Sequence, residues 1–174
     1  MKTTWTLVAA LAVSTLCVGC LSRLFSEGMG EVRGASGKVV ETGKTPDLAA
    51  YKGLRVEPIT VSSGSQTPAD MPGMIQANLA AVAEKKGLTP DGRPGLRLSG
   101  VIIQYETSSM VDKATGPLAE VIVQAKLIDA RSGDVVAEAN LIGRSKASTS
   151  SNVKDMAAGV GKALDQWLKD GGLK

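Results

Sequence analysis

Alternating apolar and polar side chains predict four β-strands in the part of the chain after about residue 50. We place them at Lys52–Val61, Gly95–Glu106, Pro117–Ala130 and Asp134–Arg144. Pro58 lies inside the first of these segments. Because proline has no N–H to donate, we expect a sheet edge or a bulge there. The polar link between the last two segments contains Gly133, which favours a tight hairpin turn.

Apolar residues at helical spacing predict two helices, Asp70–Lys86 and Asn152–Lys169. The first has Asp70 as a candidate N-cap and Gly87 just beyond its last turn. In the second, we interpret Trp167 as a core residue rather than a platform for a ligand. The apolar stripe of the first helix contains Ile75, Leu79, Val82 and Ala83, and that of the second contains Val153, Met156, Ala157, Val160, Leu164, Trp167 and Leu168.

The predicted order of elements is β-α-β-β-β-α. This order indicates an α+β fold, a two-layer sandwich in which a four-stranded mixed sheet carries two helices on one face. The last three strands are expected to form an antiparallel meander. The first strand reaches the sheet through a helix, so we expect it to pair in parallel with a neighbour.

The first 19 residues have the pattern of a bacterial signal peptide. Lys2 supplies positive charge, and an apolar run from Trp5 to Val18 follows. That run is shorter than the roughly 20 residues that span a bilayer. An uncleaved membrane anchor and a buried helix are the alternatives.

We predict that residues 20–48 form a flexible tether and that residues 49–174 form the folded domain. Glycines occur at positions 28, 30, 34, 37 and 43, and neither a helical nor an alternating period persists. The alternative is that part of this segment, Lys38–Glu41, adds a short edge strand to the sheet.

Composition argues against most catalytic chemistry. Histidine is absent, and the only cysteines are Cys17 and Cys20, so the predicted domain has neither residue for a triad, a thiol nucleophile or a zinc site. Its carboxylates are dispersed, and no phosphate-binding glycine motif occurs. We therefore expect no metal, no cofactor and no enzymatic activity. A net charge of +3 without a long basic run does not favour nucleic-acid binding.

The sequence Leu16-Cys17-Val18-Gly19-Cys20 resembles a lipobox, the processing signal of bacterial lipoproteins. Cys17 stands where that signal usually has an aliphatic residue. The resemblance implies that Cys20 becomes the first residue of the mature chain and carries acyl chains such as palmitate, which hold the protein to a membrane. Leu21, rather than aspartate, follows the cysteine. By the same resemblance, we expect an exported protein anchored in the outer membrane and facing the periplasm.

Two stretches of the predicted domain carry a second resemblance. They are Leu98-Ser99-Gly100-Val101-Ile102 and the strand–turn–strand segment Val123–Ala137, which contains Asp129-Ala130-Arg131-Ser132-Gly133-Asp134. The pattern resembles bacterial envelope lipoproteins with a domain of unknown function. More distantly, it is similar to domains of curli-secretion and outer-membrane-assembly lipoproteins. This resemblance implies a structural or docking role and carries over no catalytic residue.

We predict a lipid-anchored, non-enzymatic envelope protein that docks a protein partner in envelope assembly or secretion. Apolar side chains on the sheet face without helices, or the loop Thr107–Gly116, would contact that partner. Alternatively, the tether or a second copy of the chain covers this face. A small-ligand-binding periplasmic lipoprotein and, more remotely, a hydrolase are the other functions considered. The candidate docking residues are Val101, Ile103, Tyr105, Ile122 and Ile128.

Overall fold

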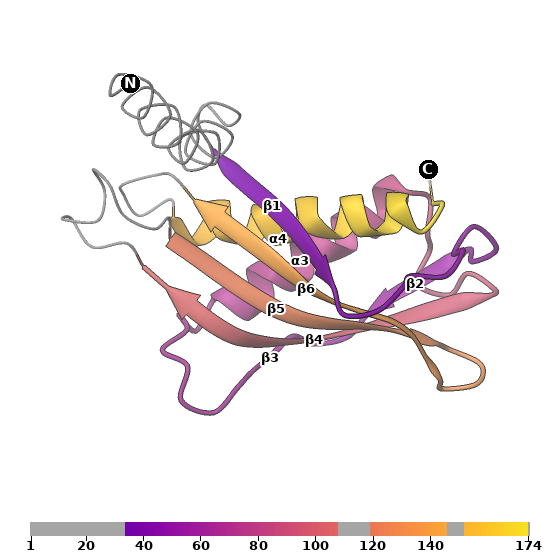
Figure 1. Cartoon of the computed structure of the whole chain (residues 1–174), viewed down its shortest axis with the longest axis horizontal. Coiled ribbons are helices and arrows are strands. Elements are labelled where there is room, and N and C mark those ends of the chain that lie inside the picture. Colours follow the sequence, from indigo (N-terminus) through magenta and orange to yellow (C-terminus); the bar gives the residue numbers. More distant parts are fainter. Residues whose placement is uncertain (1–33, 108–118, 146–151, 174) are drawn as a thin grey trace, which may run out of the picture. The chain divides into compact units, whose positions relative to one another are not determined.

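The computed structural model describes residues 34–107, 119–145 and 152–173, which form an α+β unit (Figure 1). The predicted signal peptide, Cys20 and most of the loop Thr107–Gly116 lie outside the described residues. The elements are β1 (Ala35–Glu41), β2 (Gly53–Val56), β3 (Thr60–Val61), α3 (Met71–Lys85), β4 (Gly95–Glu106), β5 (Ala119–Asp129), β6 (Val135–Ser145) and α4 (Asn152–Asp170).

The strands form one mixed sheet in the order β1-β6-β5-β4-β2, and β3 pairs with β4 beyond the end of β2. Both β2 and β3 run parallel to β4, and the other pairs are antiparallel. The predicted α+β class and mixed sheet are therefore confirmed, whereas the predicted count of four strands is wrong. One of the two extra strands arises because Lys52–Val61 is broken around Pro58 into β2 and β3.

The second extra strand, β1, lies inside the segment predicted to be a tether. Its residues pair with β6 from Ala35 opposite Ser145 to Glu41 opposite Ala139, so the edge-strand alternative is the correct one. The chain after β1 is also held in place, because Leu48 is fully buried and its N–H donates to the carbonyl of Gly171. The folded unit therefore begins at Gly34 rather than at residue 49.

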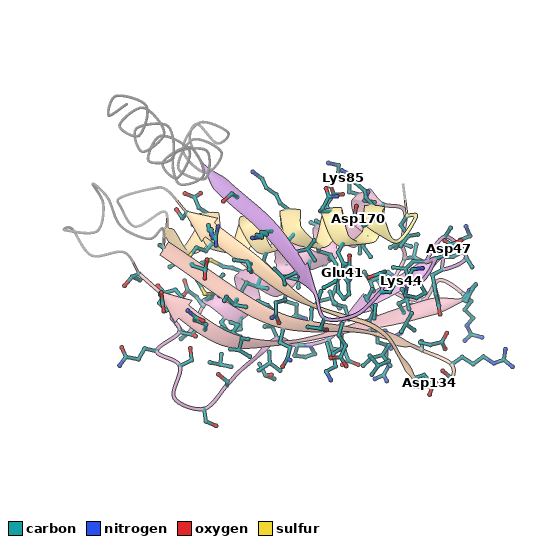
Figure 2. The ribbon with its side chains drawn as sticks, viewed as in Figure 1. Glu41, Lys44, Asp47, Lys85, Asp134 and Asp170 are labelled. Carbon is teal, nitrogen blue, oxygen red and sulfur yellow. The ribbon has the colours of Figure 1, made fainter. Side chains whose placement is uncertain are left out.

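Figure 2 shows this segment running from Glu41 past Lys44 and Asp47 near the end of α4 that carries Asp170. The Trp167 indole N–H donates to the hydroxyl of Thr45 at 2.8 Å. Trp167 is itself fully buried, which agrees with its predicted role in the core.

Both helices pack on the same face of the sheet, where alternate strand residues are buried (Figure 1). The helices lie close to the predicted positions. Ile75, Leu79 and Ala83 are buried along α3. Asp70 occupies the N-cap position of α3 but makes no side-chain hydrogen bond to the helix. The side-chain part of the predicted cap is therefore absent.

Glycine allows α4 to lie directly against the backbones of β1 and β6. A Cβ at Gly143 would overlap the carbonyl oxygen of Met156, and one at Gly159 would overlap the carbonyl oxygen of Ser36. A Cβ at Gly37 would overlap the carbonyl of Gly159 in turn. No side chain larger than hydrogen fits at these positions without moving the helix away from the sheet.

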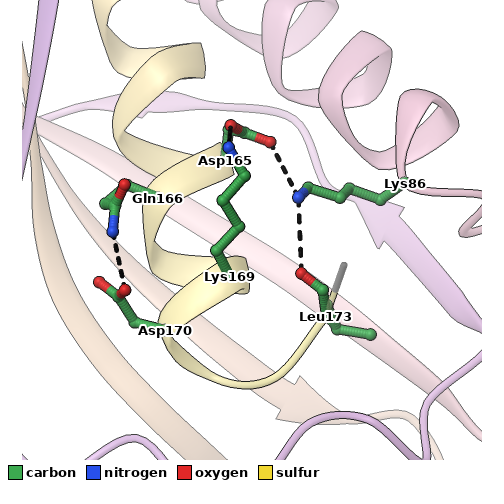
Figure 3. A network of polar contacts seen from close by, with 6 residues as sticks. All are labelled: Lys86, Asp165, Gln166, Lys169, Asp170 and Leu173. Carbon is green, nitrogen blue, oxygen red and sulfur yellow. Dashed lines mark hydrogen bonds and ion pairs between the residues drawn. The ribbon is translucent and has the colours of Figure 1, made fainter.

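A buried lysine joins the ends of the two helices (Figure 3). Lys86, whose side chain is 5% exposed, lies 3.1 Å from an Asp165 carboxylate oxygen and donates to the carbonyl of Leu173 at 3.4 Å. Asp165 also pairs with Lys169, one turn further along α4. Hydrogen bonds from Lys169 and Lys86 hold the pKa of Asp165 below its usual value, against the opposing effect of burial.

Candidate functional site: the open face of the sheet

The sheet face opposite the helices is the candidate site, because no described helix covers it (Figure 1). We call it the open face. On β5 and β6, cross-strand register places side chains on this face as opposed pairs. The pairs are Glu120 with Arg144, Ile122 with Ile142, Gln124 with Asn140, and Lys126 with Glu138.

Three of the five predicted docking residues lie on the open face. Ile122 is opposite Ile142 on β6, Val101 is opposite Gln124 on β5, and Ile128 is opposite Arg97 on β4. All three are partly exposed. The structure therefore brings their side chains onto one surface as expected.

Ile103 and Tyr105 differ because β4 contains a bulge. The register passes from Ile102 opposite Val123 to Gln104 opposite Ile122, which leaves Ile103 unpaired. Ile103 is 41% exposed. A bulge inserts one extra residue and so reverses the face on which later residues lie. Tyr105 is consequently opposite buried Val121 and packs against the core.

The assignment of Tyr105 to the open face is therefore wrong. The surroundings of its phenol agree with this position. Burial, and secondarily the negative charge of Asp70 at the start of α3, raise the pKa of Tyr105 above its ordinary value.

Ion pairs flank the apolar centre of the open face. The Arg144 guanidinium donates to Glu120 at 2.6 Å, and the Lys126 ammonium lies 3.0 Å from Glu138. Each pair is cross-strand and partly exposed. The pair of partly exposed Ile122 and Ile142, which is 9% exposed, lies between these two ion pairs, an arrangement typical of a protein-binding patch with an apolar centre and a polar rim.

Sequence reasoning missed two apolar residues of this face, Val40 and Ile142. Val40 is 41% exposed and lies opposite Asn140 on the neighbouring strand. It was overlooked because its strand was interpreted as tether. Ile142 follows buried Leu141 in a continuous apolar run, so alternation alone did not separate the two faces there. The pairing of Ile142 with Ile122 is the signal that could have found it.

The outer edge of β1 is a second feature of the site. Within the described residues, β1 pairs only with β6, so the backbone groups on its other side have no strand partner. An unpaired edge can accept a strand from another chain. Part of this edge is already occupied, because the ammonium of Lys162 on α4 donates to the carbonyl of Ala35.

Within the described ranges, no three acidic or cysteine side chains come together as metal ligands. In the same ranges, neither helix is long and apolar enough to cross a membrane.

Comparison with known proteins gives a match in structure but none in sequence. No protein-family model matches the chain, and no curated protein matches it. A crystal structure of the PelC dodecamer from Paraburkholderia phytofirmans superposes with a TM-score of 0.51 and 19% identity, covering 79% of this chain and 99% of PelC. A single-residue variant of the same dodecamer gives 0.50 and 22%, covering 74% and 95%.

The chain shares its fold with PelC. A protein from Xanthomonas campestris, of a family of unknown function, matches with a TM-score of 0.44 and 17% identity, covering 75% of this chain and 89% of that one. The likeness to PelC is one of fold. The predicted similarity to curli-secretion and outer-membrane-assembly lipoproteins is not tested by these matches and stays a prediction.

Proposed function

We propose that this protein is a lipid-anchored, non-enzymatic component of the cell envelope whose open face docks a protein partner. The observation that carries the proposal is the open face itself. A helix-free sheet surface carries the partly exposed Val101 and Ile122 near cross-strand ion pairs, and the bulge beside them exposes Ile103. Burying such a surface against a partner removes apolar area from water. It does not bury an unpaired charge, because the nearby charges already form ion pairs with one another.

The first partner we propose is a second copy of the chain. PelC, which shares the fold, is a dodecamer. In this protein, the open edge of β1 continues directly into the open face at Val40. A second copy that contacts both the β1 edge and the open face would bury apolar side chains and pair with backbone groups in one interface. Another envelope protein remains the alternative occupant of the same surface.

The test is the oligomeric state of the full chain in detergent, measured by light scattering after size-exclusion chromatography. Ile103→Glu places a charge at the exposed bulge of β4, next to Gln104, which is opposite Ile122. We expect it to shift the assembly to monomers at concentrations where the unchanged protein is assembled, because an unpaired charge in a buried interface is costly.

Val61→Glu is the matched control. Val61 is 40% exposed, nearly the same as Ile103, but it lies opposite Ile102 and so on the other face of the sheet. We expect this variant to assemble like the unchanged protein. A protein that is monomeric at all concentrations, or equal loss of assembly in both variants, would contradict self-docking. Crosslinking in membranes then tests for a different envelope protein on the same face.

A further inference from the structure

A groove rich in arginine lies at the end of the sheet where β5 turns into β6, away from the Ile122–Ile142 pair. Its volume is about 920 Å³. We call it the arginine groove. Four arginines and two aspartates from separate segments line it: Arg55 on β2, Asp91 and Arg93 before β4, Arg97 on β4, Asp129 at the end of β5, and Arg131 in the hairpin turn. The same hairpin carries Asp134, labelled in Figure 2.

The carboxylates of the groove are already engaged. Asp129 accepts the Tyr51 hydroxyl at 2.9 Å and the backbone N–H groups of Arg131 and Ser132. The two backbone donors, followed by Tyr51, hold the pKa of Asp129 below its usual value. Asp91 pairs with Arg55. Asp91 is therefore held by Arg55, whereas ionised Asp129 keeps its negative charge and interacts with the nearby charge of Arg131.

The remaining cations are Arg93 and Arg131. Both are exposed, and among the described residues neither forms an ion pair within 4 Å, although the charge of Arg131 acts on Asp129. Arg97 lies 2.7 Å from Glu57, a residue outside the groove. Four guanidinium groups against two aspartates leave the lining with net positive charge, and concave walls concentrate that potential.

The backbone of the groove is preformed. The N–H of Lys52 donates to the carbonyl of Pro94 at 2.8 Å, which attaches the loop before β4 to the start of β2. The N–H of Ala130 donates to the carbonyl of Gly95 at 3.0 Å, which attaches the hairpin to the same loop. A Cβ at Gly92 would overlap the carbonyl of Lys52, so the loop lies directly on its neighbour. A preformed site requires less ordering when its ligand binds.

We propose that the arginine groove binds a ligand that carries two or more phosphate groups. The planar guanidinium group donates in pairs to phosphate oxygens. Arg93 and Arg131 would contact different phosphates, with Arg55 and Arg97 as secondary donors. The volume exceeds what a single phosphate fills, which favours a multivalent ligand. The groove adjoins the open face where Arg97 lies opposite Ile128, but the residues changed in the two tests differ, so either proposal can fail without the other.

The test is calorimetric titration of the full chain in a neutral detergent with tripolyphosphate. We expect binding that weakens as salt is added. The double variant Arg93→Gln/Arg131→Gln is expected to lose affinity by about tenfold or more, since it removes the two arginines of the groove that form no ion pair within 4 Å. The control Lys44→Gln/Lys85→Gln removes the same charge from exposed positions outside the groove. It is expected to bind within about twofold of the unchanged protein.

Absence of binding by the unchanged protein would overturn the proposal, and so would an equal loss in the two double variants. Arg55→Gln is a second, independent variant, in case Arg93→Gln/Arg131→Gln does not fold. It removes one guanidinium group and leaves the Asp91 carboxylate without its ion pair, so it should also weaken tripolyphosphate binding. Circular dichroism checks that each variant retains its fold.

The source of the phosphate is distinguished by repeating the titration in bicelles. If bicelles containing phosphatidylglycerol compete with tripolyphosphate and neutral phosphatidylcholine bicelles do not, the phosphates are lipid headgroups. If neither competes, the ligand is a soluble phosphorylated molecule. Both results support a phosphate site and differ only in the origin of the ligand.

Discussion

At the residue scale, three glycines set the distance between α4 and the sheet. Gly37 and Gly143 lie under the helix, and Gly159 lies on it, with backbone facing backbone. The same glycines made the sequence hard to interpret. Gly34 and Gly37 favour a linker when considered locally, whereas Gly37 is in fact required by a helix more than a hundred residues away. Local composition cannot show a requirement that only tertiary contact creates.

Alanine at Gly143 should therefore be costly. We expect Gly143→Ala to lower the free energy of unfolding by about 3 kcal/mol, because the added methyl group meets rigid backbone at Met156. Urea unfolding of the full chain measures the change.

Gly73→Ala is the matched control in α3, where an added Cβ has nothing within 4 Å. It should raise stability by about 0.5 kcal/mol, because alanine is the better helix former. If both variants lost stability equally, the close helix–sheet contact would be refuted.

At the element scale, two bulges explain where the alternation of apolar and polar residues along a strand predicts the buried face correctly and where it does not. Leu96, Leu98 and Ile102 precede the bulge at Ile103 and are buried together, as their spacing predicts. Tyr105 follows that bulge and changes face. A second register shift places Val135 opposite Ile128 on the exposed side, although Val135 is two residues from buried Ala137 and strict alternation would put both on one face. A bulge leaves little local signal, so the residues beyond it could not be assigned from the sequence.

The junction of α3 and α4 should respond unequally to the loss of its two partners. Asp165→Ala leaves the buried Lys86 ammonium with only the Leu173 carbonyl. We expect this variant to lose about 2–3 kcal/mol of the free energy of unfolding, because an unpaired buried charge remains. Lys86→Met removes the charge and keeps the apolar stem, and should cost less than about 1 kcal/mol.

Lys169→Ala controls for the second, more exposed partner of Asp165 and should change stability by at most about 0.5 kcal/mol. Thermal and urea unfolding report all three variants. If Asp165→Ala and Lys86→Met lowered the free energy of unfolding equally, the argument that Asp165→Ala leaves an unpaired buried charge would be refuted.

At the scale of the whole molecule, layers and helices could be predicted, but the limits of the folded unit could not. The apolar stripes of both helices and the hairpin around Gly133, whose φ is 81°, follow from local pattern and turn chemistry. The residues of the open face were predicted only in part. Val40 belongs to a strand with too few apolar residues to be recognised, and the arginines of the groove are dispersed through the sequence and meet only through the sheet.

The proposed membrane attachment belongs to the whole molecule and would depend on Cys20, which lies outside the described residues. We expect protein extracted from membranes to have the mass of residues 20–174 plus acyl chains, because the resemblance of Leu16–Cys20 to a lipobox implies cleavage before Cys20 and lipidation of its thiol. Intact mass spectrometry measures it, beside a Cys20→Ala variant that should lack the acyl mass. An unacylated chain with a different first residue would contradict the anchor.

The position of β1 also affects how the protein is made. Ala35 of β1 pairs with Ser145 of β6, so β1 cannot form its strand pairing until a segment about 110 residues later has been synthesised. Until then, its backbone has no strand to bond, and Gly37 has no helix above it. Pairing across such a sequence separation slows folding and exposes unpaired edges in the interim. An N-terminal fragment that ends before β6 could not complete this sheet, and β1 stays without its partner strand until Ser145 has been synthesised.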